Sequence, residues 1–214
     1  MKSMRYCGRL LMLALLTVLC QAAENTFPSA GADTAFIGAW SEAVDQVRGR
    51  LVLSRFEDNQ GNAGFHVYLE LQNITFGYAS SSEWKFQYMP GESCRWRLTD
   101  VHGQTAPRWQ GGVPWTLDYA RLCLPVAIPS YSTLRFYVAS ATFMRLPNSG
   151  AQEVLVMMDD DAHSPWLVSS ADADKYSLSV ALHGFASPHD ASSGLWTGEL
   201  VLPKVALPSG QGKH

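Results

Sequence analysis

Residues 65–72 read FHVYLELQ, and this stretch indicates most clearly which kind of fold the chain adopts. Every second residue is a large apolar one, and the residues between them are polar or amphipathic. Successive side chains of a β-strand point to opposite faces, so the alternation predicts a half-buried strand. The side chains expected in the core are Phe65, Val67, Leu69 and Leu71, and those expected on the other face are His66, Tyr68, Glu70 and Gln72.

The same period of two recurs along most of the chain. In CRWRL, for example, Cys94, Trp96 and Leu98 are expected to face inward, whereas Arg95 and Arg97 face outward. Short segments of this kind are separated by clusters of Gly, Pro, Asp and Ser, without alternating helices. The strands expected in addition to 65–72 and 94–98 are 48–53, 84–88, 116–124, 133–144, 152–158, 176–185 and 195–202. About nine strands in one domain, residues 40–208, predict an all-β, immunoglobulin-like antiparallel β-sandwich.

One segment near the N-terminus shows a different period. In residues 36–47, FIGAWSEAVDQV, the apolar residues Ile37, Trp40, Val44 and Val47 recur at helical spacing. This pattern predicts a short N-terminal helix or turn that places Trp40 against the core. Residues 23–39 are small and polar for most of their length and are expected to form a lead-in to the domain.

The first 22 residues have the three parts of a cleavable export signal. Lys2, Arg5 and Arg9 provide a basic start, residues 10–19 are almost entirely apolar, and Ala22 offers a small residue for cleavage. The apolar run is too short for a membrane-spanning helix, which needs about 20 residues. A signal peptide over 1–22 predicts a periplasmic or extracellular protein. The alternative is a lipid anchor at Cys20, although Leu19 precedes it where a small residue is usual.

Charge excludes one class of partner. Residues 1–22 contain three of the 16 basic residues and none of the 19 acidic ones, which leaves 13 against 19, a formal charge of −6. Nucleic-acid binding requires a clustered basic surface, so nucleic acid is not expected as a partner. No later apolar run approaches bilayer length, so no membrane span is expected. Residues 209–214 form a polar C-terminal tail.

Two cysteines remain after the signal, Cys94 and Cys123. A pair of cysteines in an exported chain is more often a disulfide than a reactive pair, so a bond between them is predicted. Two separate buried thiols are the alternative, because the sequence does not show whether their Cβ atoms face each other.

Several segments together resemble a known group of proteins. They are the SEAVDQVRGRL stretch that follows Trp40, the turn from Asp100 to Gly103 after a strand, and the closing GLWTGELVLPKVALP with Trp196 and Pro203. In these segments the chain is similar to uncharacterised exported immunoglobulin-like β-sandwich proteins of the planctomycete type, over nearly all of residues 40–208. The resemblance implies a sandwich fold. It implies no activity.

The chain contains none of the common catalytic motifs. It has no Gly-x-Ser-x-Gly elbow, no His-Glu-x-x-His, no phosphate-binding glycine loop and no dinucleotide fingerprint. We therefore expect a protein that is not an enzyme. An enzyme built on a sandwich scaffold is the less favoured alternative, because a triad can assemble from scattered residues.

Aromatic residues provide one candidate ligand site. Trp109 and Trp115 bracket the loop sequence QGGVP, and flat indole rings stack on sugar rings. The alternative is that the two tryptophans pack over a sheet edge. Trp84, Trp96 and Trp196 lie in strand patterns and are expected in the core.

Acidic residues provide a candidate calcium site. Asp159, Asp160 and Asp161 are consecutive, and His163 follows them. Calcium prefers several oxygen ligands, although the spacing matches no EF-hand loop. The favoured interpretation is a solvated loop between two strands with no cofactor, and a calcium site is the alternative. His163, His183 and His189 are a further, weaker candidate set for copper or zinc.

These observations predict a non-catalytic extracytoplasmic binding or structural module. Its expected partner is a protein or a cell-envelope component. The alternative is a domain that binds carbohydrate or a calcium-dependent ligand.

Overall fold

Ten β-strands and a 3-10 helix form the regular structure of the residues that the computed structural model describes. These residues are 35–76, 83–89, 91–109, 124–145, 153–157, 165–184 and 195–208. The elements are β1 (Phe36–Ile37), β2 (Val47–Glu57), β3 (Ala63–Asn73), β4 (Trp84–Tyr88), β5 (Cys94–Asp100), β6 (Leu124–Ile128), β7 (Thr133–Arg145), β8 (Glu153–Met157), η1 (Ser170–Lys175), β9 (Tyr176–His183) and β10 (Glu199–Ala206). The prediction of an all-β chain is confirmed.

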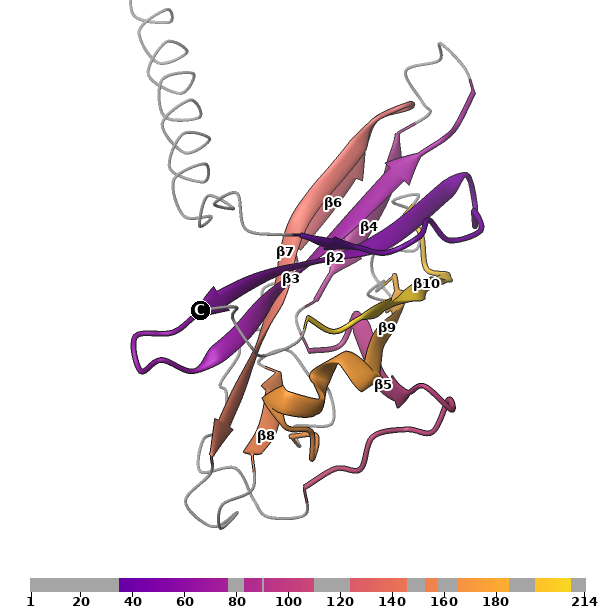
Figure 1. Ribbon diagram of the computed structural model, residues 1–214. Coiled ribbons are helices and arrows are strands. Elements are labelled where there is room, and N and C mark those ends of the chain that lie inside the picture. Colours follow the sequence, from indigo (N-terminus) through magenta and orange to yellow (C-terminus); the bar gives the residue numbers. More distant parts are fainter. Residues whose placement is uncertain are drawn as a thin grey trace, which may run out of the picture. The chain divides into compact units, whose positions relative to one another are not determined.

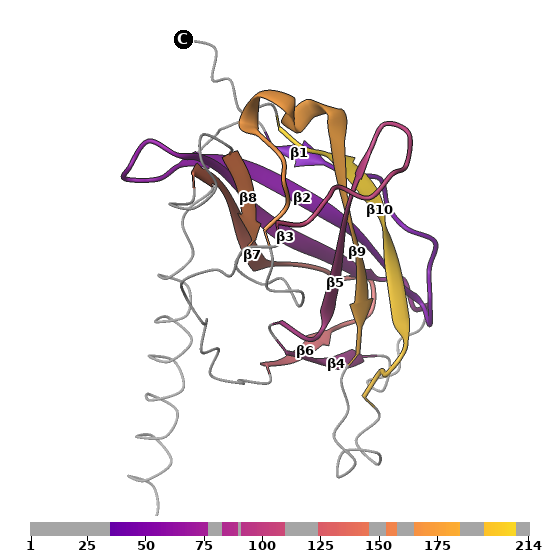
Figure 2. The same cartoon turned by 90° about the horizontal axis from the view of Figure 1, so that it is seen from below.

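The strands form three antiparallel sheets (Figure 1). Sheet A has five strands in the order β1-β2-β3-β7-β8, sheet C has three in the order β10-β9-β5, and sheet B pairs β4 with β6. In Figure 2 the strands β5, β9 and β10 of sheet C lie side by side. Strand β10 also contacts β2, so sheets A and C meet along these two strands.

Apolar side chains from all three sheets meet in one hydrophobic cluster. Phe65, Val67, Leu69 and Leu71 of β3 are each 0 % exposed, as the alternation predicted. Gly49 of β2 lies beneath side chains of β10. A Cβ atom there would come within 2.6 Å of a Leu202 methyl carbon, so a larger residue would displace the leucine side chains packed over this position. Burial of these apolar surfaces is the main source of stability.

The helix predicted over residues 36–47 is wrong, and the alternative of a turn is right. This segment runs antiparallel to β2, where Gly38 donates its backbone N–H to the Leu51 carbonyl at 2.8 Å. Its backbone groups therefore bond to a neighbouring strand rather than within a helix. Asp45 and Gln46, with φ of 50° and 66°, form the two-residue turn into β2.

Two loops in the molecule have the same hydrogen bonding. In the β2–β3 connection the Asp58 carboxylate accepts the N–H groups of Gln60 and Asn62, and Gly61 has φ 78°. In the loop after β5 the Asp100 carboxylate accepts from the residues two and four positions later, and the glycine φ is 79°. An Asp side chain that bonds the backbone ahead of it, followed by a glycine with positive φ, stabilises such turns. The turn predicted at Asp100–Gly103 is confirmed.

The remaining strand predictions differ in their boundaries. The strand expected over 116–124 overlaps β6 only at Leu124, and residues 110–123 lie outside the described part. Strand β8 is buried on both faces from Val154 to Met157. The last strand begins at Glu199 and continues past Pro203, with an irregular register between Leu202 and Val205. Proline is compatible with β10 because this strand is at the edge of its sheet.

The described residues belong to one structural unit, Asp33–His214. Sheet A begins at Phe36, within the range predicted as a lead-in. The predicted signal peptide, including Cys20, and the predicted tail lie outside the described residues. Within the described ranges, no helix is long and apolar enough to cross a bilayer.

Candidate ligand-binding site

The outer face of sheet C, the side away from the hydrophobic cluster, presents two arginines from β5. Cys94, Trp96 and Leu98 of this strand are buried, so the alternation places Arg95 and Arg97 on the opposite side. Both arginines are exposed. Residues two apart on a strand lie about 6.6–6.8 Å apart along it, so the two guanidinium groups form a pair on one face.

The central strand of sheet C has small side chains between two rows of longer ones. Ala181 of β9 lies between Arg95 of β5 and Val201 of β10, and Ser179 lies opposite Arg97. Because Ala181 and Ser179 are short, a hollow of about 340 Å³ runs along β9. We call it the arginine groove, and its outward-facing residues are Arg95, Arg97, Ser179, Ala181, His183, Glu199 and Val201.

The two walls of the arginine groove differ in chemistry. On the β5 side, Arg95 and Arg97 form no side-chain hydrogen bond or ion pair with any residue that the structure describes. On the β10 side, Val201 is 60 % exposed, and the Glu199 carboxylate lies 3.5 Å from His183 Nδ1. The other ring nitrogen of His183, Nε2, is buried and has no hydrogen-bond partner among the described residues. The groove therefore combines two available guanidinium groups, an apolar contact and one acidic end.

This arrangement is suited to holding anionic groups. A guanidinium group presents planar N–H donors that match a carboxylate in a bidentate fashion, and two such groups lie side by side. A carboxylate on a ligand would gain hydrogen bonds that no described residue makes with these two arginines. The exposed isopropyl group of Val201 could contact an apolar part of the same ligand.

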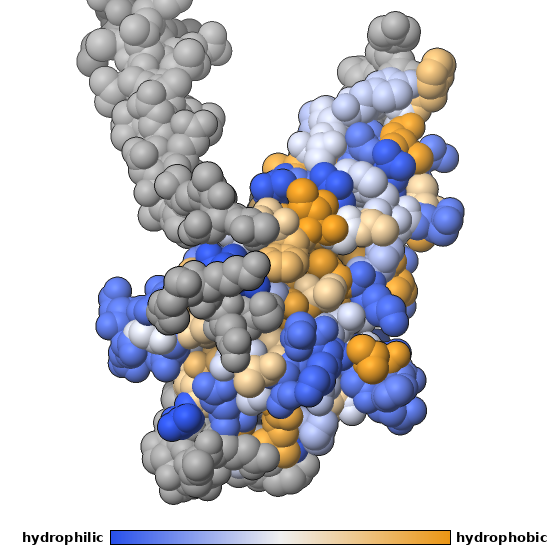
Figure 3. Space-filling view, viewed as in Figure 1, coloured by the Kyte–Doolittle hydropathy of each residue, from blue (hydrophilic) through white to orange (hydrophobic). Residues whose placement is uncertain are grey.

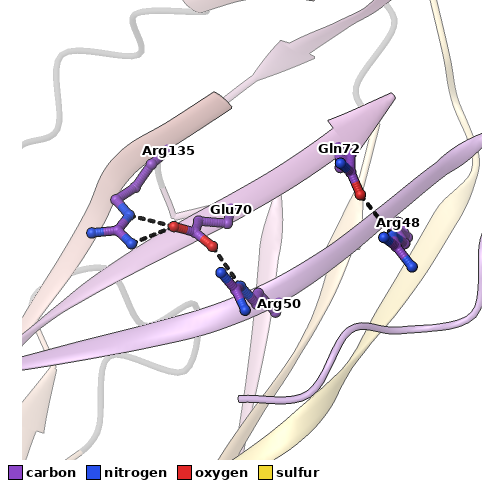
Figure 4. A network of polar contacts seen from close by, with 5 residues as sticks. All are labelled: Arg48, Arg50, Glu70, Gln72 and Arg135. Carbon is purple, nitrogen blue, oxygen red and sulfur yellow. Dashed lines mark hydrogen bonds and ion pairs between the residues drawn. The ribbon is translucent and has the colours of Figure 1, made fainter. Parts of the chain in front are cut away.

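Arginines on the outer face of sheet A are arranged differently (Figure 4). Arg50 and Arg135 lie on either side of Glu70, and Arg50 Nε donates to a Glu70 carboxylate oxygen at 2.5 Å. Arg48 Nε donates to the side-chain oxygen of Gln72 at 2.8 Å. Within this group each guanidinium has a partner, and Glu70 is only 5 % exposed.

Arg50 and Arg135 stabilise the negative charge of the Glu70 carboxylate. Burial acts to raise its pKa, but the hydrogen bonds and positive charges of Arg50 and Arg135 outweigh burial and hold the pKa below its ordinary value. The predicted outward orientation of Glu70 is confirmed, although the side chain is buried by its neighbours on β2 and β7.

The Trp40 ring was expected against the core. It lies instead beside Arg48 and Arg50, whose Cζ atoms are 4.9 and 4.5 Å from the ring centroid.

The tryptophan pair predicted as a sugar site is only partly within the described residues. Trp109 is half-buried and packs against the small cluster of Val154 and Val156. This packing agrees with the alternative that it covers part of a sheet. Trp115 lies outside the described residues, so the pair stays a prediction. Trp84, Trp96 and Trp196 are buried, as expected.

The predicted calcium ligands, Asp159, Asp160, Asp161 and His163, all lie outside the described residues, as does His189. Two aspartates that follow later in the sequence, Asp172 and Asp174, are described. Asp172 accepts from Lys175 at 2.5 Å and from Ser169 at 2.9 Å in η1, and these contacts lower its pKa. Among the described residues, no three His, Cys, Asp or Glu side chains come close enough to hold a metal ion.

The predicted disulfide is also only partly within the described residues. Cys94 is fully buried at the start of β5. Cys123 is not described, but Leu124, which follows it, pairs with Tyr88 of β4. The Cys94–Cys123 bond therefore stays a prediction.

Sequence reasoning placed Arg95 and Arg97 on the outer face without identifying them as a site. The signal was present in the alternation of CRWRL, but the groove also needs Ser179 and Ala181 on the neighbouring strand. Comparisons with protein-family models, with curated proteins and with solved structures found no match, so the resemblance to planctomycete-type proteins stays an expectation.

Proposed function

We propose that this protein is an exported, non-catalytic binding module that recognises an anionic group of a partner protein through the arginine groove. The observation on which the proposal mainly depends is the pair Arg95 and Arg97, exposed beside a hollow and without a partner among the described residues. Exposed arginines are common on proteins. What distinguishes these two is their shared face, the adjacent hollow, and the contrast with Arg48, Arg50 and Arg135 of sheet A, each of which has a side-chain partner.

A sheet face is a better candidate for recognition than a sheet edge. Strand addition needs an open edge with free N–H and C=O groups. At the β5 edge Ala106 donates its N–H to the Leu98 carbonyl at 2.9 Å, and at β8 Trp166 and Leu155 bond each other. The edge strand β10 is irregular between Leu202 and Val205. Partner recruitment by strand addition therefore has little support in the described part of the chain.

Apolar docking has less support than anion binding. In Figure 3 the apolar surface of the visible face gathers around β1 and β2, with hydrophilic residues on either side. Ile37 of β1 is 53 % exposed there. None of the described residues around it specifies a partner, whereas two guanidinium groups without a partner in the described part of the chain specify the charge of theirs.

The finer description of the fold and location belongs to the same proposal. We infer an immunoglobulin-like sandwich because antiparallel sheets share one hydrophobic cluster. Export is supported by the basic start, apolar run and small residues of 1–22. A Cys94–Cys123 disulfide fits that location and belongs to the same proposal.

Amide NMR titration with glutarate, a small dicarboxylate, tests the proposed function. Resonances of β5 and β9 around Arg95, Arg97 and Ala181 are expected to shift, and those around Arg50 and Arg135 are expected to stay. In Arg95→Ala/Arg97→Ala the shifts disappear, whereas the matched control Arg145→Ala/Lys204→Ala, which also removes two exposed positive charges, keeps them. Shifts that are absent from the groove, or that survive the loss of both groove arginines, would contradict the proposal.

A further inference from the structure

We infer that the natural ligand of the arginine groove is an extended peptide segment with acidic side chains at alternate positions, belonging to the partner protein. This inference rests on the proposed function and specifies its ligand. It follows from the spacing of the two arginines, the shape of the groove and the charge of the whole chain.

The spacing favours an extended peptide. Arg95 and Arg97 are separated by one residue on β5, so they repeat along the strand with the period of two. An extended peptide has the same repeat, since its side chains at positions i and i+2 point to one side about 6.6–6.8 Å apart. A peptide with acidic residues at i and i+2 therefore places one carboxylate at each guanidinium. Adjacent acidic residues point to opposite sides, and only one of them reaches the face.

The shape of the groove is consistent with such a ligand. The hollow follows β9, whose small residues Ser179 and Ala181 lie between the β5 and β10 rows. Neighbouring strands are about 4.8 Å apart, so the two rows are separated by roughly twice that distance. An extended chain lying along β9 would have Arg95 and Arg97 on one side and Val201 on the other.

The position of Glu199 adds a polarity to the ligand. This carboxylate lies at the His183 end of the groove, on the β10 side of β9. The chain segment that precedes Arg95 lies on the other side of β9. An acidic side chain there would be repelled, so the acidic positions of the ligand are confined to the stretch beside Arg95 and Arg97. The expected pattern is two alternate acidic residues, flanked at the Glu199 end by a neutral or basic residue.

The charge of the chain favours a short acidic segment over a long anionic polymer. The whole chain has a formal net charge of −3. Because the chain is negative overall, a polymer that extends well beyond the two arginines gains no general attraction from the rest of the chain, whereas a segment with two acidic residues needs only the groove. We therefore favour a peptide over an acidic polysaccharide, which the experiment also examines.

Isothermal titration calorimetry with two short capped peptides tests the inference. The peptides have the same composition, with two Glu residues separated by one Thr in the first and adjacent in the second. The full chain is expected to bind the alternating peptide about tenfold more tightly than the other peptide. The difference arises because the peptide with adjacent Glu residues loses about one charged contact. Arg95→Ala and Arg97→Ala are each expected to remove this preference, and Arg145→Ala/Lys204→Ala is expected to keep it.

Two results would overturn the inference: the first leaves the proposed function intact, and the second leaves anion binding by the arginine groove but not its protein partner. The first is equal affinity for both peptides, lost together in Arg95→Ala/Arg97→Ala. The second is tighter binding of an oligomer of galacturonic acid than of the alternating peptide, again dependent on both arginines. If neither the peptides nor the oligomer binds in a way that depends on these arginines, the proposed function fails as well. Thermal unfolding of each variant, followed by circular dichroism, shows whether it is folded.

Discussion

The outer faces of sheets A and C each contain arginines, but the two groups of arginines have different surroundings. On sheet A, Arg50 and Arg135 share the carboxylate of Glu70 between neighbouring strands. On sheet C, Arg95 and Arg97 lie on one edge strand beside the short side chains of β9. The residue type is the same, and the neighbouring strand decides its role. An arginine opposite an acidic residue stabilises a sheet, whereas one beside a hollow remains available to a ligand.

The largest effect is expected when the sheet A network loses its acidic centre. Glu70→Ala leaves the Arg50 and Arg135 guanidinium groups without their shared partner, and Glu70 is 5 % exposed. Removing one partner of a buried pair costs 3–5 kcal/mol, and the partial exposure of both arginines reduces this to about 2 kcal/mol. Urea unfolding measures the loss. A loss no larger than that of Arg95→Ala would remove the distinction between the two faces.

Glu70 also makes a specific prediction about acid. Its pKa is lowered on folding, so its stabilising effect is fully present above the unfolded pKa and is lost as pH falls through the folded pKa. The wild type and Glu70→Gln are therefore expected to differ in unfolding free energy at neutral pH and to converge as pH falls below the ordinary glutamate value of 4.5. Urea midpoints measured across this range provide the comparison. A difference that stays constant into acid would show that Arg50 and Arg135 do not stabilise the carboxylate charge.

Filling the groove is expected to have the next largest effect, and on binding rather than on stability. Ala181→Leu places a larger side chain between Arg95 and Val201, where the hollow depends on a short one. We expect about tenfold weaker binding of glutarate, equivalent to about 1.4 kcal/mol, with an unfolding free energy within about 0.5 kcal/mol of the wild type. Calorimetry and urea unfolding measure the two quantities. Unchanged affinity would show that the ligand does not enter the hollow.

The smallest effect is expected at the aromatic ring beside the sheet A arginines. Trp40→Leu removes the ring that lies near Arg48 and Arg50 and leaves their hydrogen bonds to Gln72 and Glu70. Cation–π contacts at exposed sites contribute about 0.5–1 kcal/mol, so a loss of that size is expected in urea unfolding. A loss of several kcal/mol would indicate that Trp40 is part of the core, as its helical spacing in the sequence suggested.

The inward and outward sides of single strands could be predicted from the sequence. The inward side chains of residues 65–71 and 94–98 are buried, as expected, because alternation within one strand is a local property. The pairing of β5 with β9 is not local, since about 80 residues separate them. The hollow above Ala181 could therefore not be seen before the structure placed these strands together.

Two other differences have physical explanations. The apolar spacing of Ile37, Trp40 and Val44 suggested a helix, but the adjacent strand β2 offers backbone partners that favour an extended chain. The Asp58 loop was not predicted, although it has the same Asp-x-x-Gly sequence as Asp100 to Gly103. Comparing the two loops in the sequence alone could have identified the β2–β3 hairpin.

Removing the arginines from each face in turn tests the central claim most directly. Arg95→Ala/Arg97→Ala and Arg50→Ala/Arg135→Ala each remove two positive charges, and both glutarate affinity and unfolding free energy are measured for each in the same buffer. The account predicts that the first variant loses glutarate binding with stability within about 0.5 kcal/mol of the wild type, and that the second loses stability and keeps its affinity. Equal effects of the two variants on binding, or loss of binding in the second alone, would contradict it.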